Sequence, residues 1–502
     1  MELHISFVIV PFFLLFLFHL LSKYFNPKTN KLPPGPKKFP LIGNLHQLAM
    51  SKKLPHHALG DLAHKYGPLM HLQLGEVSTI IVSSPKFAKE VMKTHDLVFA
   101  NRPKLLSSEI MAYGSKDIVF SPYGDFWRQL RKICVLELLS TKRVQSFSYI
   151  REDESTKMIQ LIQSSANSTI NLTSRILSMV SNAIARAAFG EKSQDQEEFV
   201  VLVKKVIDLT SGLDIDDLFP SIKPLHMLTG MRSKLEKFHK RVDTITENIV
   251  RQHQEKRSGK EDNNIDVENE DLVDVLLRVQ QSGNLDVEIT TNNIKAVIWD
   301  IFVAGTDTTA TTILWTMSEL MKHTSVRKKV QDELREVCKG KETIHDSDLQ
   351  DLSYLKLVMK EALRLHPPSP LLVPRESSEL TIIDGYEIPK NTKLIINAWA
   401  VARDPEYWND AEMFIPERFN DNLVDFKGNN FEFIPFGAGR RMCPGISFGL
   451  ASVMLPLALL LYHFDWELPN GMKPENLDMT EHFGMAVGRE SDLCLIPSVY
   501  VI

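Results

Sequence analysis

Cysteine is scarce in this chain, with four residues among 502 and no paired spacing between them. This scarcity excludes a disulfide framework and favours a reducing compartment. Positive charge is not in excess either, since the formal net charge is −5, which argues against a nucleic-acid partner. The chain also has no G-x-G-x-x-G sequence with which to bind a dinucleotide of its own.

Linkers and internal repeats are absent after the first 40 residues, so the chain does not divide into several small domains. The hydrophobic fraction of 43% and the charged fraction of 24% are ordinary for a globular protein with a sizeable core. Helical periodicity dominates, and a β-hairpin is expected between Met70 and Val82, around Gly75. The sequence predicts one large domain over residues 41–502, mostly α with a small β portion.

An almost wholly apolar run extends from Ile5 to Leu21, close to the minimum length for crossing a bilayer. Several lysines follow it and none precedes it, so the positive-inside rule places the N-terminus in the lumen and the main domain in the cytosol. The alternative is a cleaved signal peptide, but the run lacks a basic segment before it and a small-residue cleavage site after it. We predict that residues 1–22 are a single-pass transmembrane signal-anchor.

Residues 23–40 are basic and rich in proline, with Leu32-Pro33-Pro34-Gly35-Pro36 at their centre. Consecutive prolines exclude helix and stiffen the chain in an extended form. We therefore predict a basic, proline-rich hinge between the anchor and the main domain.

A single cysteine, Cys443, stands in the glycine-rich stretch Phe433–Leu450. Pro444 and the apolar run after it predict a buried helix, because proline is favoured at the first helical position. The sulfur would then lie at the positive end of a helix dipole beside Arg441, which favours the thiolate over the thiol. Such a thiolate suits a metal whose other ligand carries anionic groups. The alternative is that Cys443 is a small buried hydrophobic residue, as most lone cysteines are.

A polar stretch, Ala304–Thr309, interrupts the long apolar helical pattern of Ile294–Met321. Glycine costs about 1 kcal/mol against alanine in a helix, and a buried aspartate costs more unless it has a partner. Local rules broken inside an otherwise favourable helix indicate a functional site. The alternative is a polar seam or a kink without chemistry.

Three further patterns carry little information by themselves. Trp127 and Arg131 are four residues apart and share a helix face. The pair Glu361 and Arg364, three residues apart, occurs on many surface helices. His366 precedes Pro367 and is interpreted as a helix-ending residue rather than a metal ligand.

The spacing F-x-x-G-x-R-x-C-x-G from Phe436 to Gly445 resembles the haem-binding loop of the cytochrome P-450 monooxygenases. The stretch Ala304–Thr308 is similar to that family's A/G-G-x-D/E-T pattern, and the W-x-x-x-R, E-x-x-R and P-E-R-F patterns also match, in the family order. The resemblance covers the whole chain and implies the cytochrome P-450 fold with an N-terminal anchor. It makes Cys443 the axial ligand of the haem iron, where a thiolate favours O–O cleavage.

The resemblance also implies roles for residues far apart in the chain. Proton delivery falls to Asp307 and Thr308; contacts to haem fall to Trp127, Arg131, Arg375, Phe436, Gly439, Arg441 and Gly445; a structural ion network falls to Glu361, Arg364 and Arg418; and the substrate pocket falls to Ile301, Ala304, Leu371, Leu372, Val373, Met485 and Ala486. Phe436 would shield the sulfur, and Gly439 and Gly445 would permit a close turn.

The implied activity is insertion of one oxygen atom from molecular oxygen into a hydrophobic substrate by haem b. Electrons would come from NADPH through cytochrome P-450 reductase, with cytochrome b5 as a second candidate donor, at the endoplasmic reticulum membrane. Stretches such as GPLMHLQLGE, SPYGDFWRQLRKIC and LLYHFDW resemble plant microsomal members that oxidise sesquiterpenes and diterpenes. An alkaloid or phenolic substrate, an isomerase or dehydratase that needs no molecular oxygen, and a haem sensor or electron carrier remain the alternatives.

Overall fold

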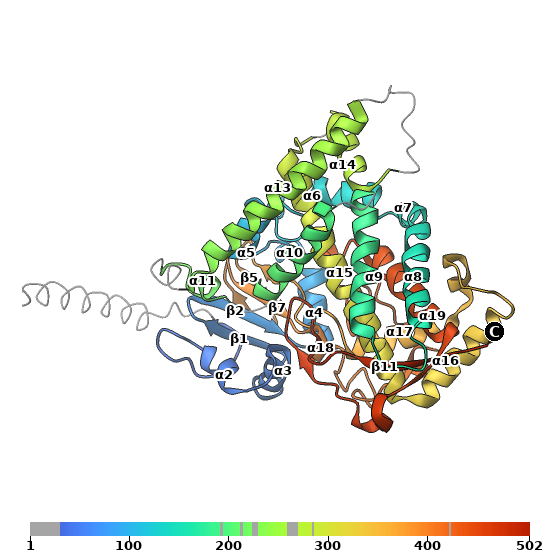
Figure 1. Cartoon of the computed structure of the whole chain (residues 1–502). Helices are drawn as coiled ribbons and strands as arrows, with labels where there is room; N and C mark the ends of the chain where they lie inside the picture. Colours follow the sequence, from blue (N-terminus) through green and yellow to red (C-terminus); the bar gives the residue numbers. More distant parts are fainter. Residues whose placement is uncertain are drawn as a thin grey trace, which may run out of the picture.

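The computed structural model describes residues 31–190, 194–210, 214–222, 229–258, 270–283, 286–420 and 423–501. The predicted anchor and residues 23–30 of the predicted hinge lie outside the described residues. Helices dominate, as predicted, and Figure 1 shows them gathered around the long helix α15, with a small sheet region on one side. The helices are α2 (Leu45–Met50), α3 (Pro55–Tyr66), α4 (Pro85–Lys89), α5 (Leu106–Met111), α6 (Asp125–Ile133), α7 (Thr141–Ser146), α8 (Ser148–Gln163), α9 (Leu172–Phe189), α10 (Gln194–Thr210), α11 (Ile215–Leu218), α13 (Met231–Ser258), α14 (Leu272–Gln281), α15 (Thr291–Lys322), α16 (Thr324–Val337), α17 (Ser353–Leu365), α18 (Ala398–Val401) and α19 (Ile446–His463).

Short helical turns connect these helices at several places. Two are π-helical, η1 (Glu90–Thr94) and η2 (Cys134–Leu138), and five are 3₁₀ turns, η5 (Asp346–Asp351), η6 (Pro416–Phe419), η7 (Gly439–Arg441), η8 (Pro469–Gly471) and η9 (Pro474–Asn476).

The largest sheet has four strands in the order β1-β2-β7-β4. The predicted hairpin is confirmed, because β1 pairs antiparallel with β2, from Leu69 opposite Val82 to Leu74 opposite Val77. Strand β7, from far along the chain, then adds in parallel to β2. The strands are β1 (Leu69–Leu74), β2 (Val77–Val82), β3 (Ile170–Asn171), β4 (Arg375–Glu376), β5 (Thr381–Ile383), β6 (Tyr386–Ile388), β7 (Lys393–Ile396), β8 (Phe464–Glu467), β9 (Glu481–His482), β10 (Gly488–Arg489) and β11 (Cys494–Val499).

The main hydrophobic core is built around α15 and α19. Both helices are buried over most of their length because their sequences are apolar on nearly every face. Among the described residues, α19 is the one helix long and apolar enough to cross a membrane, yet 67% of its 18-residue window is buried inside the protein. Its apolar character is that of a core helix.

The described part of the predicted hinge, from residue 31 onward, is extended and lies against β1. The Pro34 carbonyl accepts a hydrogen bond from the His71 amide at 2.8 Å. A Cβ atom at Gly35 would lie 2.1 Å from the His71 carbonyl oxygen, so a residue other than glycine would clash there. The proline-rich segment is thereby joined to the sheet at its C-terminal end.

One expected helix start differs from the structure. Helix α19 begins at Ile446 with Gly445 as its N-cap, so Pro444 precedes the helix instead of occupying its first position. Helix α4 begins at Pro85, and Ser84 before it makes no side-chain capping hydrogen bond; the Ser84 hydroxyl is buried without a partner among the described residues. The start of α19 therefore lies two residues after the position that the preference of proline for the first helical position predicts.

Candidate active site

The cysteine stretch folds into a tight loop whose shape depends on glycine. The Cys443 amide donates to the Phe436 carbonyl at 3.0 Å, which closes the loop. Gly439 adopts a φ of +71°, and a Cβ atom there would lie 2.2 Å from the Met92 carbonyl oxygen. Only glycine combines this left-handed backbone with so close an approach. Gly445 is different: its φ is −93°, and a Cβ atom would make an ordinary 4.0 Å contact with the Cys443 sulfur, so the turn does not require glycine there.

The Cys443 side chain is solvent-accessible and enclosed at the same time. It is exposed, yet the surrounding protein is dense enough that burial raises the pKa of its thiol. The Gly445 amide and the Arg131 guanidinium oppose this effect without overcoming it. A side chain that faces an internal space combines these two properties. The expectation that the protein alone favours the thiolate is wrong here, because desolvation outweighs the neighbouring dipole and charge.

Helix α15 contains a second accessible position in an otherwise buried setting. Ala304 is exposed although it lies near the middle of a 32-residue helix, between a mostly buried turn before it and a half-buried turn, residues 305–308, after it. The Thr308 hydroxyl, one turn later, donates to the Ala304 carbonyl at 2.6 Å. Ile301 is half-buried and packs against the same core cluster as Phe436 of the cysteine loop. Helix α15 also packs against α19, the helix that follows the cysteine loop.

The polar stretch of α15 does not interrupt the helix. Residues Thr291–Lys322 form one continuous helix. Gly305 instead serves packing, because a Cβ atom there would lie 3.0 Å from the Ile184 Cδ1 atom of α9. The Asp307 carboxylate accepts a hydrogen bond from the Ala486 amide at 3.2 Å. The acid on α15 is thus connected directly to the C-terminal turn between β9 and β10.

Four arginines lie near one another, and neighbouring arginine charges lower the pKa values of two of them, Arg102 and Arg441. Burial, then the charges of Arg375 and Arg131, lower the pKa of Arg441 to about 9, although Asp117 partly offsets them. Burial, Arg441 and Arg375 likewise lower the pKa of Arg102. The Arg441 Nη1 atom is buried and has no hydrogen-bond partner among the described residues. Such an excess of buried positive charge calls for an anionic ligand.

The predicted cationic residues are held by specific backbone contacts. Arg441 donates to the carbonyls of Ala100 at 2.7 Å and Ser121 at 2.6 Å. Arg375 donates to the Ala438 carbonyl at 2.8 Å and pairs with Asp96 at 3.1 Å, so part of its guanidinium is already occupied.

Trp127 and Arg131 share a face of α6, as predicted from their spacing, with the guanidinium 5.8 Å from the ring centroid. The indole N–H donates to the Ile118 carbonyl at 3.0 Å. The ring instead supports Arg441, whose guanidinium lies 4.0 Å from the ring centroid. Trp127 therefore positions a cation and does not present a free N–H donor.

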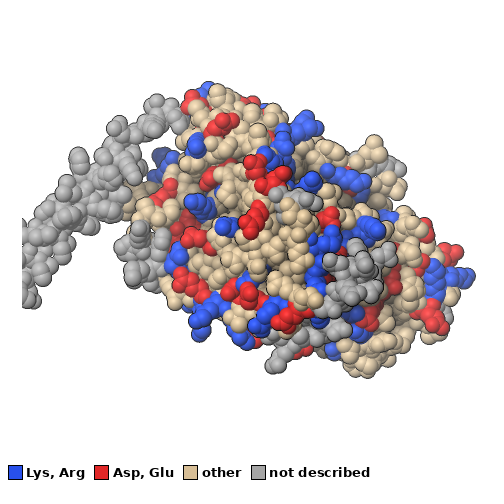
Figure 2. All heavy atoms as spheres, turned by 90° about the horizontal axis from the view of Figure 1, so that it is seen from above, with Lys and Arg blue, Asp and Glu red and all other residues tan. Residues whose placement is uncertain are grey.

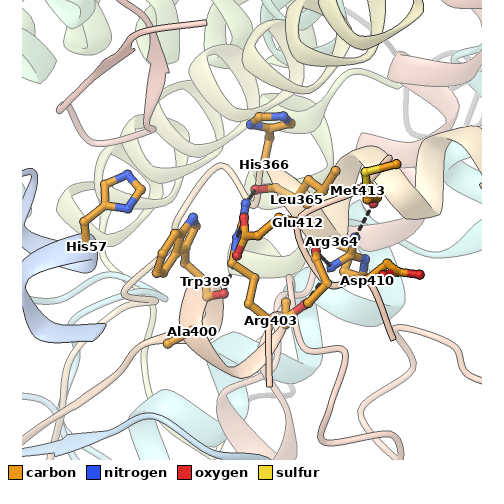
Figure 3. Close-up of polar contacts among 12 residues, drawn as sticks. His57, Arg364, Leu365, His366, Trp399, Ala400, Arg403, Asp410, Glu412 and Met413 are labelled. Atoms are coloured by element: carbon orange, nitrogen blue, oxygen red, sulfur yellow. Dashed lines mark hydrogen bonds and ion pairs between the residues drawn. The ribbon is translucent and has the colours of Figure 1, made fainter. Parts of the chain in front are cut away.

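The structure contains the expected ion network around Glu361. Arg364 donates to both carboxylate oxygens at 2.8 Å, and Arg418 donates to Oε1 at 2.9 Å. The side chains of Glu361 and Arg364 are fully buried. Figure 3 shows Arg364 directed at the Met413 carbonyl, to which it donates at 3.0 Å. The network therefore ties α17 to the segment that leads toward the cysteine loop.

The three residues expected to line the pocket from the proline-rich segment after α17 do not point the same way. The segment is not helical, but it turns at Leu372, whose amide donates to the Ser369 carbonyl at 3.0 Å and whose φ is +50°. Leu371 packs against the cluster formed by β1 and α3, whereas Leu372 packs against the cluster that contains Ile434 of the cysteine loop. Val373 is half-buried, and its carbonyl accepts from Arg102 at 2.8 Å.

The C-terminal turn holds the two remaining pocket candidates. Ala486 is 5% exposed and Met485 is 40% exposed, so they face different environments. The Val487 amide donates to the Pro368 carbonyl at 2.8 Å, and the Trp315 indole donates to the Val487 carbonyl at 2.9 Å. The turn is thus held between α15 and the proline-rich segment that follows α17.

His366 is not available as a metal ligand. Its ring stacks on Trp315 with centroids 4.2 Å apart and contacts the Glu319 carboxylate at 2.7 Å. These contacts join the end of α17 to α15, and they agree with the interpretation of His366 as a helix-ending residue.

Sequence reasoning missed three residues of this region. Arg102 is 7% exposed and bonds to the carbonyls of Val119, Val373 and Pro374. Asp117 and Asp300 are also buried, with carboxylates that accept from backbone amides. Asp300 could have been found by the signal used for Asp307, because it too is an acid within an apolar helical run.

The face of the molecule drawn in Figure 2 shows no comparable concentration of one charge among the described residues. Figure 2 shows lysine and arginine side chains interspersed with aspartate and glutamate over the face that it presents. The concentration of arginines around Arg441 is therefore a feature of the interior of the protein.

Comparisons with known proteins identify relatives over nearly the whole chain. The family model described as cytochrome P-450 matches residues 33–492. The chain is 61% identical to cytochrome P-450 71D8 of Glycine max over 495 residues, covering 98% of each chain. It is 54% identical to premnaspirodiene oxygenase of Hyoscyamus muticus, covering 99% of this chain and 98% of the relative. It is 55% identical to desmethyl-deoxy-podophyllotoxin synthase of Sinopodophyllum hexandrum, covering 97% of this chain and 95% of the relative.

A solved structure has the same fold. A zebra fish cytochrome P-450 determined with progesterone superimposes with a TM-score of 0.76 at 26% identity, covering 89% of this chain and 100% of the other.

Proposed function

The chain belongs to the cytochrome P-450 family of haem-dependent monooxygenases, and we propose that it oxidises a hydrophobic plant terpenoid, a sesquiterpene or diterpene, at the site around Cys443. The observation that carries this proposal is the enclosed yet accessible cysteine sulfur in a loop whose glycine requirement matches the family motif. A relative named for a terpene, premnaspirodiene oxygenase, supports the substrate class.

The residues present fit haem. Haem offers an iron for a sulfur ligand and two carboxylates for cations, and this chain provides an accessible cysteine and a group of arginines with a buried, unpartnered Nη1 atom on Arg441. Cys443 would ligate the iron, and Arg131 and Arg441 would neutralise the carboxylates. Arg375 would do so with the part of its guanidinium not held by Asp96. A bound metal deprotonates a coordinating thiol outright, which would reverse the raised thiol pKa of the protein alone.

Haem supplies the activation of molecular oxygen, so that one oxygen atom enters the substrate and the other leaves as water. The residues of α15 would manage the protons of this reaction. The Thr308 hydroxyl gives its hydrogen to the Ala304 carbonyl, so its lone pairs remain to hold a water molecule by accepting from it. Asp307, kept in place by the Ala486 amide, would pass protons inward from the C-terminal turn.

The substrate would contact the accessible side of α15 and the C-terminal turn. Ala304 presents a small side chain and Ile301 an aliphatic one. Met485 is partly exposed and is followed in the chain by the buried Ala486. Apolar surface of this kind binds a hydrophobic substrate without fixing polar groups on it. Electrons would come from NADPH through cytochrome P-450 reductase, with cytochrome b5 as a second donor, at the endoplasmic reticulum membrane.

Three measurements test this function. A reduced, carbon monoxide-bound spectrum of the thiolate type is expected, and its absence from a haem-loaded protein would refute ligation by Cys443. Incubation with reductase, NADPH and oxygen-18 gas should place the label in the product, whereas unlabelled product would indicate an isomerase or dehydratase. A panel of sesquiterpenes, diterpenes, alkaloids and phenolics should yield turnover with a terpene.

A phenolic-type substrate is the second candidate. The relative named desmethyl-deoxy-podophyllotoxin synthase is as similar to this chain as premnaspirodiene oxygenase, at 55% against 54% identity. Overall identity therefore does not separate the two substrate classes, and turnover of a phenolic without turnover of any terpene in the same panel would replace the terpenoid proposal.

A further inference from the structure

A short loop between α5 and α6, residues 117–121, is bonded on both of its sides. Its amides point toward two aspartates. The Asp300 Oδ2 atom on α15 accepts from the amides of Ile118 at 2.9 Å and Val119 at 3.3 Å. The Asp117 Oδ1 atom accepts from the Phe120 amide at 2.9 Å.

The carbonyls of the same loop point toward side chains that we propose to lie around the haem. They accept from the Trp127 indole at 3.0 Å, from the Arg102 Nε atom at 2.9 Å and from the Arg441 Nη2 atom at 2.6 Å. The loop therefore links the two aspartates to the Trp127 ring and to two of the arginines, Arg102 and Arg441, so that the aspartates help to fix where these side chains lie. It connects α15, which carries the proposed proton-delivery residues, with the cationic side of the site.

The two aspartates are buried and adjacent. Asp117 is 1% exposed and Asp300 is 6% exposed, and their carboxyl groups lie within hydrogen-bonding reach of each other. The Asp117 Oδ2 atom has no donor among the described residues unless the Asp300 carboxyl carries a proton. Two buried carboxylates so close together cannot both be ionised without a large cost.

We propose that Asp117 and Asp300 share one proton and that this acid pair positions the 117–121 loop, and through it Trp127, Arg102 and Arg441. The Asp300 hydroxyl donates to the Asp117 Oδ2 atom, while the Asp300 carbonyl oxygen accepts the two loop amides. In this arrangement every carboxyl oxygen of the pair has a hydrogen-bond partner, because one group is a protonated acid that can donate and the other is a carboxylate that accepts. The consequence for haem rests on the proposed function, whereas the shared proton does not.

The surrounding charges favour Asp300 as the protonated partner. Burial raises the pKa of Asp300 well above its usual range, with the Asp117 charge as the next cause, whereas that of Asp117 rises only to about 6. Arg102 and Arg441 face Asp117 and stabilise its negative charge. Besides Asp117, the buried Cys134 thiol faces Asp300, and it offers no positive charge.

The pH dependence follows from these directions. An acid whose pKa is raised in the folded state stabilises the fold while it is protonated and loses that contribution as the pH rises. Alkaline pH should therefore ionise Asp300, place a second buried negative charge beside Asp117 and loosen the 117–121 loop.

Infrared difference spectroscopy on the full-length haem-loaded protein tests the shared proton directly. The wild type at neutral pH should show the carbonyl stretching band of a protonated carboxylic acid, and Asp300→Asn should lack it. Asp332→Asn, which changes an exposed carboxyl group on α16, should retain the band. A band that persists in Asp300→Asn, or that is absent from the wild type, would overturn the proposal.

Amide hydrogen exchange tests the positioning role. Asparagine at position 300 keeps both the carbonyl acceptor and a donor to Asp117, so the exchange protection of residues 118–120 should change less than about twofold. Asp300→Leu removes both contacts and should lower that protection about tenfold or more. Toward alkaline pH the wild type should lose protection and Asp300→Asn should keep it. Equal protection in Asp300→Leu and the wild type would refute the positioning role.

Haem retention separates this inference from the proposed function. If Asp300→Leu does not fold, the wild type and Asp300→Asn still decide the infrared result. In folded variants, transfer of haem to apomyoglobin should be faster for Asp300→Leu than for Asp300→Asn, and equal rates would remove the effect on haem. Cys443→Ser should keep the acid band while it loses the thiolate spectrum, so failure of one proposal leaves a distinct signature from failure of the other.

Discussion

The cysteine loop and the acid of α15 belong to one candidate site but are built in different ways. The loop is closed by a hydrogen bond between Phe436 and Cys443, seven residues apart by their numbering, and by a glycine with positive φ. Asp307 is held by the Ala486 amide, 179 residues away in the chain. The backbone geometry of a loop requires particular residues at nearby positions, which can be recognised in the sequence. A contact between distant segments produces no such local pattern.

The largest effect should come from the cysteine loop. Cys443→Ser removes the thiolate, and the expected result is complete loss of the thiolate-type spectrum in the reduced, carbon monoxide-bound protein, together with monooxygenase activity. Cys494→Ser is the matched control, because Cys494 lies in β11 outside the cysteine loop, and it should leave the spectrum unchanged. Retention of the thiolate spectrum by Cys443→Ser would show that another residue binds the iron.

The Glu361 network should show the next largest effect, on stability. Glu361→Gln leaves the buried guanidinium of Arg364 and that of Arg418 without their shared anion, and it should lower the free energy of unfolding by about 3–5 kcal/mol. Glu417→Gln, at a carboxylate that is 43% exposed, should change it by less than about 1 kcal/mol. Denaturant unfolding measures both variants, and equal losses would mean that burial of the network is unimportant.

On α15, substitution of Thr308 should affect coupling, the amount of product formed per NADPH, more than it affects stability. Thr308→Ala removes one hydroxyl, and the loss of one hydrogen bond of about 1–1.5 kcal/mol predicts about a tenfold fall in product formed per NADPH, with more hydrogen peroxide. Thr316→Ala removes a similar bond to the helix backbone two turns later, to the Thr312 carbonyl, and should leave coupling unchanged. If coupling is unchanged in Thr308→Ala, that residue has no part in proton delivery.

The smallest effect is expected at Gly305. Alanine gains about 1 kcal/mol of helix propensity, but its Cβ atom would lie 3.0 Å from the Ile184 Cδ1 atom, so the two terms nearly cancel in the free energy of unfolding. Ile184→Val removes that terminal methyl group, so Gly305→Ala should be stabilising in the Ile184→Val background. A double-mutant cycle measures the difference, and additive effects would show that glycine is not needed for this packing.

Much of the fold and part of the site could be predicted from the sequence. The mostly helical class, the β1–β2 hairpin and the importance of Gly439 depend on periodicity and backbone geometry, which neighbouring residues encode. The start of α19 at Ile446 could not be predicted, because the segment before it is held by the cysteine loop and not by helix propensity.

Side-chain directions were the main source of error. Trp127 was expected to contact haem, but its N–H bonds to the Ile118 carbonyl, and Leu371 and Leu372, both expected in the substrate pocket, pack against different clusters. The Cys443 thiol was expected to favour the thiolate, but burial raises its pKa. Each of these outcomes depends on atoms contributed by other elements, which spacing along one segment does not describe.

The sequence by itself determined which residue types carry the chemistry: a cysteine in a glycine-dependent loop, an acid and a hydroxyl within a helix, and a Glu–Arg pair. The tertiary structure decided how they are held. It brought four arginines together, connected Asp307 to a turn near the C-terminus and brought Asp117 against Asp300. The physical reason is that local backbone preferences act between neighbouring residues, whereas burial and charge act between whatever the fold brings into contact.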